Sequence, residues 1–198
     1  DYFMENKLFN ESETNIEENL ETLLELAKNC KKIGVKIIEI PLVDSSSLKS
    51  DTDKKQLVDN LEKIIQEIEN LGITITLETD LPSDEFLNLL NMFKDKSIGA
   101  NYDTGNSASL GYDVNKEIEV LGGKIMNIHL KDRTLSGGTV PFGLGNTNFA
   151  DFFTMLKKIN YSGDLIIQGA REQEMSPEQD CIKYLRFTKQ YLDKYCEK

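Results

Sequence analysis

Four polar side chains stand at or near the ends of separate short apolar runs in this chain. They are Glu78, Asp103, His129 and Gln168. One Glu, one Asp and one His form an oxygen-rich ligand set that suits Mn²⁺ or Mg²⁺ and, by affinity, also Co²⁺ or Zn²⁺. A divalent ion there could polarise a carbonyl and its neighbouring hydroxyl and stabilise an enediolate, while an adjacent carboxylate moves the proton. Aldose–ketose isomerisation and carbon epimerisation need this combination.

Each of these residues also has an ordinary structural explanation. Glu78 could cap the following helix or pair with a surface cation, and a lone His such as His129 is often structural. Asp103, followed by Thr104-Gly105, could simply initiate a turn. The joint occurrence of a Glu, an Asp and a His at three successive strand ends nevertheless favours the metal site.

Hydrophobic periodicity predicts the elements that must position these side chains. Short β-branched or apolar runs predict strands over residues 35–41, 73–78, 97–103, 124–130 and 164–168, with Tyr2-Phe3-Met4 as the tail of a sixth. Apolar residues at helical spacing predict helices over residues 16–32, 57–68, 84–94, 114–121, 149–159 and 177–195. Gly34 and Gly72 mark the ends of the first two helices.

Strands that alternate with helices predict parallel strands joined by right-handed crossovers. A doubly wound sheet and a (β/α)8 barrel both fit this rule. The barrel is favoured because polar residues collect at the C-terminal ends of several strands, and because no GxGxxG or GxxxxGK[ST] follows any strand. A full barrel takes about 250 residues. Residues 1–198 are therefore expected to form a single, incomplete TIM-barrel domain of about six βα units, with two N-terminal units missing.

Composition and charge narrow the classes of partner. Hydrophobic residues make up 39% and charged residues 29%, as in ordinary globular proteins, and no apolar run is long enough for a membrane span. The net charge of −11 disfavours nucleic acid, because such binding relies on Lys and Arg. Cys30, Cys181 and Cys196 form no CxxC and are odd in number, so a reducing cytoplasm is the expected location.

Five short segments, in this order and spacing, carry a family resemblance. They are Leu77-Glu78, Asp103-Thr104-Gly105-Asn106, His129-Leu130-Lys131-Asp132, Val140-Pro141-Phe142-Gly143-Leu144-Gly145, and the terminal strand from Asp164 to Gln168. With them the chain resembles the xylose isomerase-like TIM-barrel superfamily of sugar phosphate isomerases and epimerases. The resemblance runs from about Tyr2 to the C-terminus. It implies a sugar or sugar phosphate as substrate, and a divalent metal held by the side chains at positions 78, 103, 129 and 168.

The resemblance also implies a catalytic pair, which falls here on Glu78 and Gln168. The superfamily usually has Glu at the second position. A Gln carbonyl can still ligate a hard cation, but it carries no charge and cannot act as a base. A lower metal affinity is therefore expected. A one-base isomerisation with Glu78 as the base survives this change better than a symmetric two-carboxylate epimerisation.

Further residues are implied in substrate binding. In the superfamily the His-x-Lys-Asp segment lies on the rim of the barrel and helps to position substrate. The expected contacts are Asn106, Lys131, Asp132, Arg133 and Arg171. Lys131 or Arg133 could hold a phosphate or a carboxylate, or could simply belong to a solvated strand end. The loop from Ser136 to Gly145 is flexible by composition, and a role in phosphate binding stays open.

Several functions fit these observations. The first is a metal-dependent sugar or sugar-phosphate isomerase or epimerase that acts through an enediolate. An inosose-type dehydratase would expel water from the same intermediate. A metal-free barrel that binds a carbohydrate or a partner is supported by Gln168. Endonuclease IV-like DNA repair needs a His-rich zinc cluster, which one His and a net charge of −11 disfavour. Related barrels often pair through surface helices, so a homo-oligomer is also open.

Overall fold

The computed structural model describes residues 2–94, 97–172 and 174–196. The chain divides into two compact units. The first unit comprises Asp1–Leu81 and Glu85–Asn101, and the second comprises Pro82–Asp84 and Tyr102–Lys198. The strands follow chain order, β1-β2-β3-β4-β5. β3 (Ile98–Asp103) begins in the first unit and ends in the second, and all six of its residues are buried.

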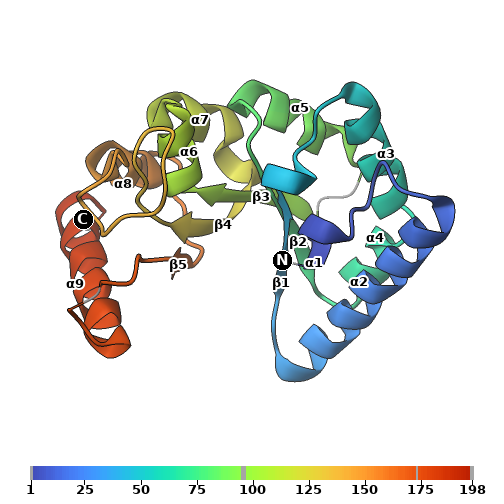
Figure 1. Ribbon diagram of the computed structural model, residues 1–198, viewed down its shortest axis with the longest axis horizontal. Coiled ribbons are helices and arrows are strands. Elements are labelled where there is room, and N and C mark those ends of the chain that lie inside the picture. Colours follow the sequence, from blue (N-terminus) through green and yellow to red (C-terminus); the bar gives the residue numbers. More distant parts are fainter. Residues whose placement is uncertain (1, 95–96, 173, 197–198) are drawn as a thin grey trace. The chain divides into compact units, whose positions relative to one another are not determined.

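The first unit places helices against parallel strands. Its helices are α1 (Tyr2–Glu5), α2 (Glu13–Ile33), α3 (Asp51–Leu61), α4 (Ile65–Asn70) and most of α5 (Ser83–Met92), with a 3-10 turn, η1, at Asp44–Ser46. β1 (Ile37–Leu42) runs parallel to β2 (Thr74–Thr79), and Pro41 lies opposite Glu78. β2 runs parallel to β3. Figure 1 shows α2, α3 and α4 as neighbours, in agreement with their contacts.

Local signals define the first long helix, α2. The Ser12 hydroxyl accepts the backbone N–H of Asn15 and caps the first turn. The apolar face, which includes Leu20 and Leu23, is buried. Gly34 ends the helix with a φ of 81°, a left-handed conformation that glycine adopts without steric cost and that redirects the chain towards β1.

Two predictions for the first unit are wrong. Tyr2-Phe3-Met4 forms helix α1 instead of a sixth strand, because the Asn6 N–H bonds to the Tyr2 carbonyl and the turn buries Phe3. The described residues therefore contain five strands. The single helix predicted over residues 57–68 is divided into α3 and α4. Two i→i+3 hydrogen bonds, Lys63 N–H to Asn60 and Ile64 N–H to Leu61, tighten the backbone between them.

The second unit continues the alternation. Its elements are α6 (Thr104–Leu110), α7 (Val114–Leu121), the 3-10 turn η2 (Gly122–Lys124), β4 (Ile125–Leu130), α8 (Phe149–Lys158), β5 (Leu165–Ile167) and α9 (Pro177–Tyr195). β4 and β5 are parallel, with His129 opposite Ile166, and the Gln168 N–H bonds to the Leu130 carbonyl at 2.9 Å. α8 packs against both α7 and α9 (Figure 1). Phe152 and Phe153 of α8 are fully buried in this core.

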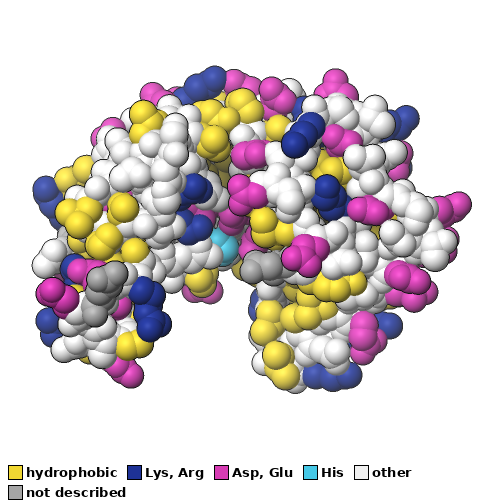
Figure 2. Space-filling view, in the orientation of Figure 1, with side chains coloured by type: hydrophobic (Ala, Val, Ile, Leu, Met, Phe, Trp, Pro, Cys, Tyr) yellow, Lys and Arg dark blue, Asp and Glu magenta, His cyan; other side chains and the backbone are white. Residues whose placement is uncertain are grey.

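The surface is rich in acidic side chains. Figure 2 shows Asp and Glu scattered over much of the visible face, as expected from the net charge of −11. No helix in residues 2–94, 97–172 and 174–196 combines the length and the apolar character that a membrane crossing requires.

Candidate metal centre

In the first unit two carboxylates and a carboxamide gather on one face of the sheet. Glu39 of β1 lies opposite Thr76 of β2, and side chains two residues apart in a strand share a face, so Glu39 and Glu78 point to the same side. One carboxylate oxygen of Glu39 lies within 4.8 Å of one of Glu78. The Asn101 Nδ2 donates to Glu78 Oε2 at 2.5 Å. Glu78 is 6% exposed and Asn101 is 2% exposed.

This donor set fits a hard divalent cation. Two carboxylates at such a short distance repel each other, and a cation shared between them removes that cost. Glu39 and Glu78 supply carboxylate oxygens, the ligands that Mg²⁺ and Mn²⁺ prefer. Within the described ranges, the buried Thr76 Oγ1 makes no protein hydrogen bond. It is therefore available to a water or to a ligand.

Asp103 is the centre of a second cluster, which lies in the second unit. Its Oδ1 accepts the N–H groups of Gly105 at 2.9 Å and Asn106 at 2.8 Å, which caps α6. Its Oδ2 lies 2.8 Å from Lys131 Nζ and 3.9 Å from His129 Nδ1. The Asp103 side chain is only 1% exposed. The same aspartate thus begins a helix with one oxygen and faces the Lys131 ammonium and the His129 imidazole with the other.

His129 and Gln168 meet beside this aspartate. Gln168 Nε2 lies 3.0 Å from His129 Nδ1, and His129 is 8% exposed. A carboxamide can present either its N–H or its oxygen to an imidazole nitrogen. When the oxygen accepts from Nδ1–H, the imidazole keeps Nε2 for a metal ion. Three of the four predicted ligands, those at positions 103, 129 and 168, therefore lie together in the second unit, whereas Glu78 belongs to the first.

Two predicted substrate contacts bond to each other. Arg133 Nη1 donates to Asn106 Oδ1 at 2.8 Å, and its Nε donates to the Gly137 carbonyl at 2.9 Å. These bonds fix the guanidinium over the loop that follows β4. Arg171, in the segment after β5, is exposed.

The carboxylate of Asp132 holds the loop that follows β4. Asp132 is fully buried, and its carboxylate accepts the N–H groups of Gly143 at 2.8 Å, Gly145 at 2.9 Å and Thr147 at 3.0 Å. A β-bridge between Arg133 and Thr139 joins the two sides of the same loop. The loop that its glycines predict to be flexible is therefore anchored from within, and both oxygens of Asp132 are engaged in this anchoring.

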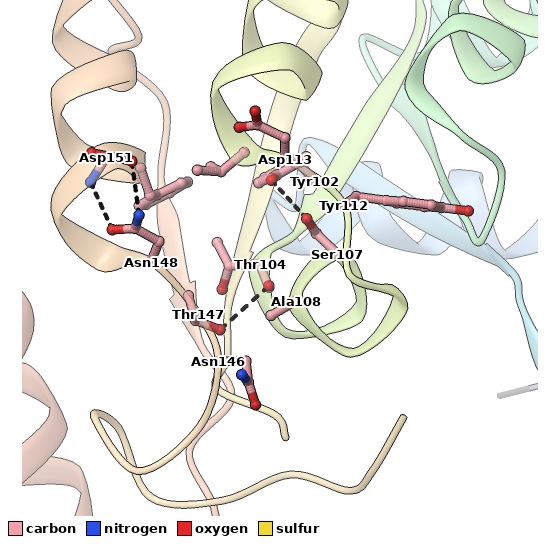
Figure 3. A pocket seen from close by; sticks show the side chains of 12 residues that line it. Tyr102, Thr104, Ser107, Ala108, Tyr112, Asp113, Asn146, Thr147, Asn148 and Asp151 are labelled. Carbon is pink, nitrogen blue, oxygen red and sulfur yellow. Dashed lines mark hydrogen bonds between the residues drawn. The ribbon is translucent and has the colours of Figure 1, made fainter. Parts of the chain in front are cut away.

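The backbone of Lys131 is held beside a small cavity. Thr104 Oγ1 donates to the Lys131 carbonyl at 2.7 Å and accepts the Lys131 N–H at 2.9 Å. Thr147 Oγ1 donates to the same carbonyl at 3.0 Å. Both threonines also line a cavity of about 130 Å³ within the second unit (Figure 3). The position of Lys131 thus depends on residues from two segments of this unit.

A buried acidic network borders the same cavity. Tyr102 and Ser107, which line it, both donate their hydroxyl groups to the Glu117 carboxylate, the former at 2.9 Å. Burial raises the pKa of Glu117, although both hydrogen bonds act in the opposite direction. Burial also raises the pKa of Tyr102 well above its ordinary value, and the Glu117 charge adds to this effect. Tyr102 therefore stays a neutral donor.

The sequence interpretation missed Glu39 and Asn101. Glu39 interrupts the apolar run Ile37–Ile40, and a charged residue inside such a strand is a signal that could have been used. Asn101 precedes Asp103 by two residues on β3, and the period of two gives the two side chains the same orientation from the strand. A search for polar residues at i−2 from each strand end would have found it.

The family is established by comparison. The family model of the xylose isomerase-like TIM barrel matches residues 5–191, so the chain belongs to this family. The predicted resemblance is thereby confirmed, as is the class of fold.

Two curated relatives carry the names of sugar-phosphate epimerases. SgbU of Haemophilus influenzae is 27% identical over 193 residues, which cover 89% of this chain and 65% of SgbU. The L-ribulose-5-phosphate 3-epimerase UlaE of Escherichia coli is 25% identical over 181 residues, which cover 84% of this chain and 61% of UlaE. The chain thus spans less than two-thirds of the length of these curated relatives.

Solved structures support the fold alone, because their sequence identity is low. The IOLI protein with a binding zinc atom has a TM-score of 0.82 at 20% identity, and the match covers 96% of this chain and 75% of that protein. A xylose isomerase domain protein from Planctomyces limnophilus has a TM-score of 0.77 at 20% identity, with coverages of 92% and 67%.

Proposed function

We propose that this protein is a divalent-metal-dependent epimerase or isomerase of a sugar or sugar phosphate, and that it acts through an enediolate. The observation that carries the proposal is the pair Glu39 and Glu78, two carboxylates within 4.8 Å on one face of the sheet, in a chain of this family. The name of its relative UlaE suggests L-ribulose 5-phosphate as the first substrate to test.

The proposed metal ligands are Glu78, Asp103, His129 and Gln168, with Glu39 added because of its position beside Glu78. Mn²⁺ or Mg²⁺ suits this set best, and Co²⁺ or Zn²⁺ would also bind. When bound, the ion supplies the positive charge that stabilises the enediolate oxygens.

Glu78 is proposed as the base. Asn101 donates to its Oε2 at 2.5 Å and so helps to fix the plane of the carboxylate that would take the proton from the substrate carbon. Glu78 is only 6% exposed, which limits the access of competing water to its side chain. Gln168 cannot exchange a proton, so it is assigned to ligation and to its contact with His129.

Proton exchange tests this proposal. The chain is incubated with Mn²⁺ in D₂O with L-ribulose 5-phosphate, a panel of other ketoses and their phosphates, and inososes. Deuterium at the substrate carbon and the products are followed by NMR. Wild-type protein is expected to exchange the proton, and Glu78→Gln to slow this exchange by about 10²–10⁴-fold. Glu67→Gln, at an exposed glutamate of α4, is the control and should leave the rate unchanged.

The outcomes separate the alternatives. Exchange by Glu78→Gln at the wild-type rate would show that Glu78 is not the base. Loss of water from an inosose would identify a dehydratase on the same scaffold. No exchange with any compound, together with no binding of Mn²⁺, Mg²⁺, Co²⁺ or Zn²⁺, would favour a binding protein.

A further inference from the structure

Lys131 packs against three consecutive residues, Asp103, Thr104 and Gly105. Thr104 holds its backbone N–H and carbonyl at 2.9 and 2.7 Å. Asp103 Oδ2 lies 2.8 Å from its ammonium nitrogen. The lysine side chain is 18% exposed and the aspartate side chain 1% exposed, so this is a largely buried ion pair. Both ends of the lysine are fixed by the segment that begins α6.

Gly105 provides the space for the lysine stem. A Cβ at this position would lie 2.7 Å from Lys131 Cγ and 2.9 Å from both its Cβ and Cδ, closer than carbon atoms can approach. Gly105 lies within α6, where an ordinary helix former would be more stable than glycine. Glycine lowers the stability of the helix at this position, but a larger residue would leave no space for the Lys131 side chain.

The ammonium occupies the side of Asp103 that a metal ion would need. Oδ1 is already engaged by two backbone N–H groups at the start of α6. Oδ2 is the oxygen that lies 2.8 Å from Lys131 Nζ and 3.9 Å from His129 Nδ1. A divalent ion bound to Oδ2 at about 2.0–2.6 Å would place two positive centres on one buried oxygen, where their repulsion is poorly screened.

We propose that Lys131 is the resident counter-ion of Asp103, and that a divalent cation must displace its ammonium in order to bind. The inference rests on the proposed function and names a residue that regulates the affinity of the proposed metal site for its cation. Lys131 keeps the buried carboxylate neutralised when no divalent ion is bound, and it lowers the affinity for the ion by competition.

Calorimetric titration with MnCl₂ tests the competition, with four variants of the full chain. Lys131→Met and Lys131→Gln remove the ammonium and are expected to lower the Kd by at least about tenfold, because the ammonium then no longer competes with the ion for a buried carboxylate oxygen. Gly105→Ala keeps the charge, but its Cβ would push the Lys131 side chain away from Asp103. This variant should therefore also lower the Kd. Lys158→Met removes an exposed lysine of α8 and should change the Kd less than about twofold.

Each outcome is decisive. If wild-type protein binds Mn²⁺ and the Lys131 variants bind equally or more weakly, the inference is overturned and the proposed function stands. If neither the wild type nor any folded variant binds Mn²⁺, both are overturned. Circular dichroism identifies the folded variants, and Gly105→Ala decides the question if the Lys131 variants do not fold.

Discussion

The loop between β4 and α8 depends on one buried carboxylate, and this dependence can be measured. Asp132 accepts three backbone N–H groups at 2.8, 2.9 and 3.0 Å. A hydrogen bond to a charged group contributes about 1.5–3 kcal/mol, but bonds that share an acceptor are not additive. Gly143 is exposed, so its N–H can return to water. Asp132→Ala is therefore expected to lower the free energy of unfolding by about 2–4 kcal/mol.

Asp132→Asn should have an intermediate effect. Its single carbonyl oxygen can still accept the Gly143 and Gly145 N–H groups, which both bond to Oδ2 of the aspartate. Its NH₂ group would then face the Thr147 N–H, which is also a donor. Urea denaturation measures both free energies. Hydrogen exchange at Gly143, Gly145 and Thr147 shows whether the loss is located in the loop.

Asp164→Asn changes an exposed aspartate of the same unit and should stay within about 0.5 kcal/mol of the wild type. An Asp132→Ala protein within the same limit would refute the anchoring role. The role is also refuted if the three loop amides exchange at wild-type rates, whatever the global stability.

Burial raises the pKa of Glu117, so its ionisation destabilises the fold as the pH rises above the ordinary value of 4.5. The stability of Glu117→Gln relative to the wild type should increase between pH 4.5 and 7.5 in urea denaturation, and a constant difference would contradict this. His129→Ala should weaken Mn²⁺ binding by about tenfold or more in calorimetry; an unchanged Kd would remove His129 from the ligand set. Gln168→Glu adds a charge and should tighten Mn²⁺ binding by about tenfold or more, whereas weaker binding would count against Gln168 as a ligand.

Two helices, α7 and α9, could be predicted to the residue, whereas α2 begins at Glu13, before its predicted start at residue 16. α7 begins after Asp113, whose carboxylate accepts the Asn115 N–H, and α9 begins after Ser176 with a capping box and a proline at its first position. α6 was missed, because Asp103-Thr104-Gly105-Asn106 is equally typical of a turn. Only the structure shows that the Asp103 carboxylate accepts two successive N–H groups and starts a helix.

The positions of the candidate site residues could be predicted, but their atomic partners could not. Strand ends in a parallel α/β fold share one edge, which is why Glu78, Asp103, His129 and Gln168 were chosen together. The ion pair between Asp103 and Lys131 depends on space left by Gly105. The burial of Asp132 depends on a loop that folds back on it. Neither feature has a signature in hydrophobic periodicity.

The register of β1 and β2 identifies the neighbours of Glu39, which the sequence alone does not. A glutamate between Ile38 and Ile40 is expensive to bury without a partner, and the sequence alone names none. The parallel register sets Thr76 opposite Glu39, which brings Glu78, two residues further on, to the same face. Two carboxylates within 4.8 Å destabilise each other unless they share a proton or a cation. Closely spaced carboxylates are the usual ligands of hard divalent cations, and on this basis Glu39 joins Glu78 in the proposed ligand set.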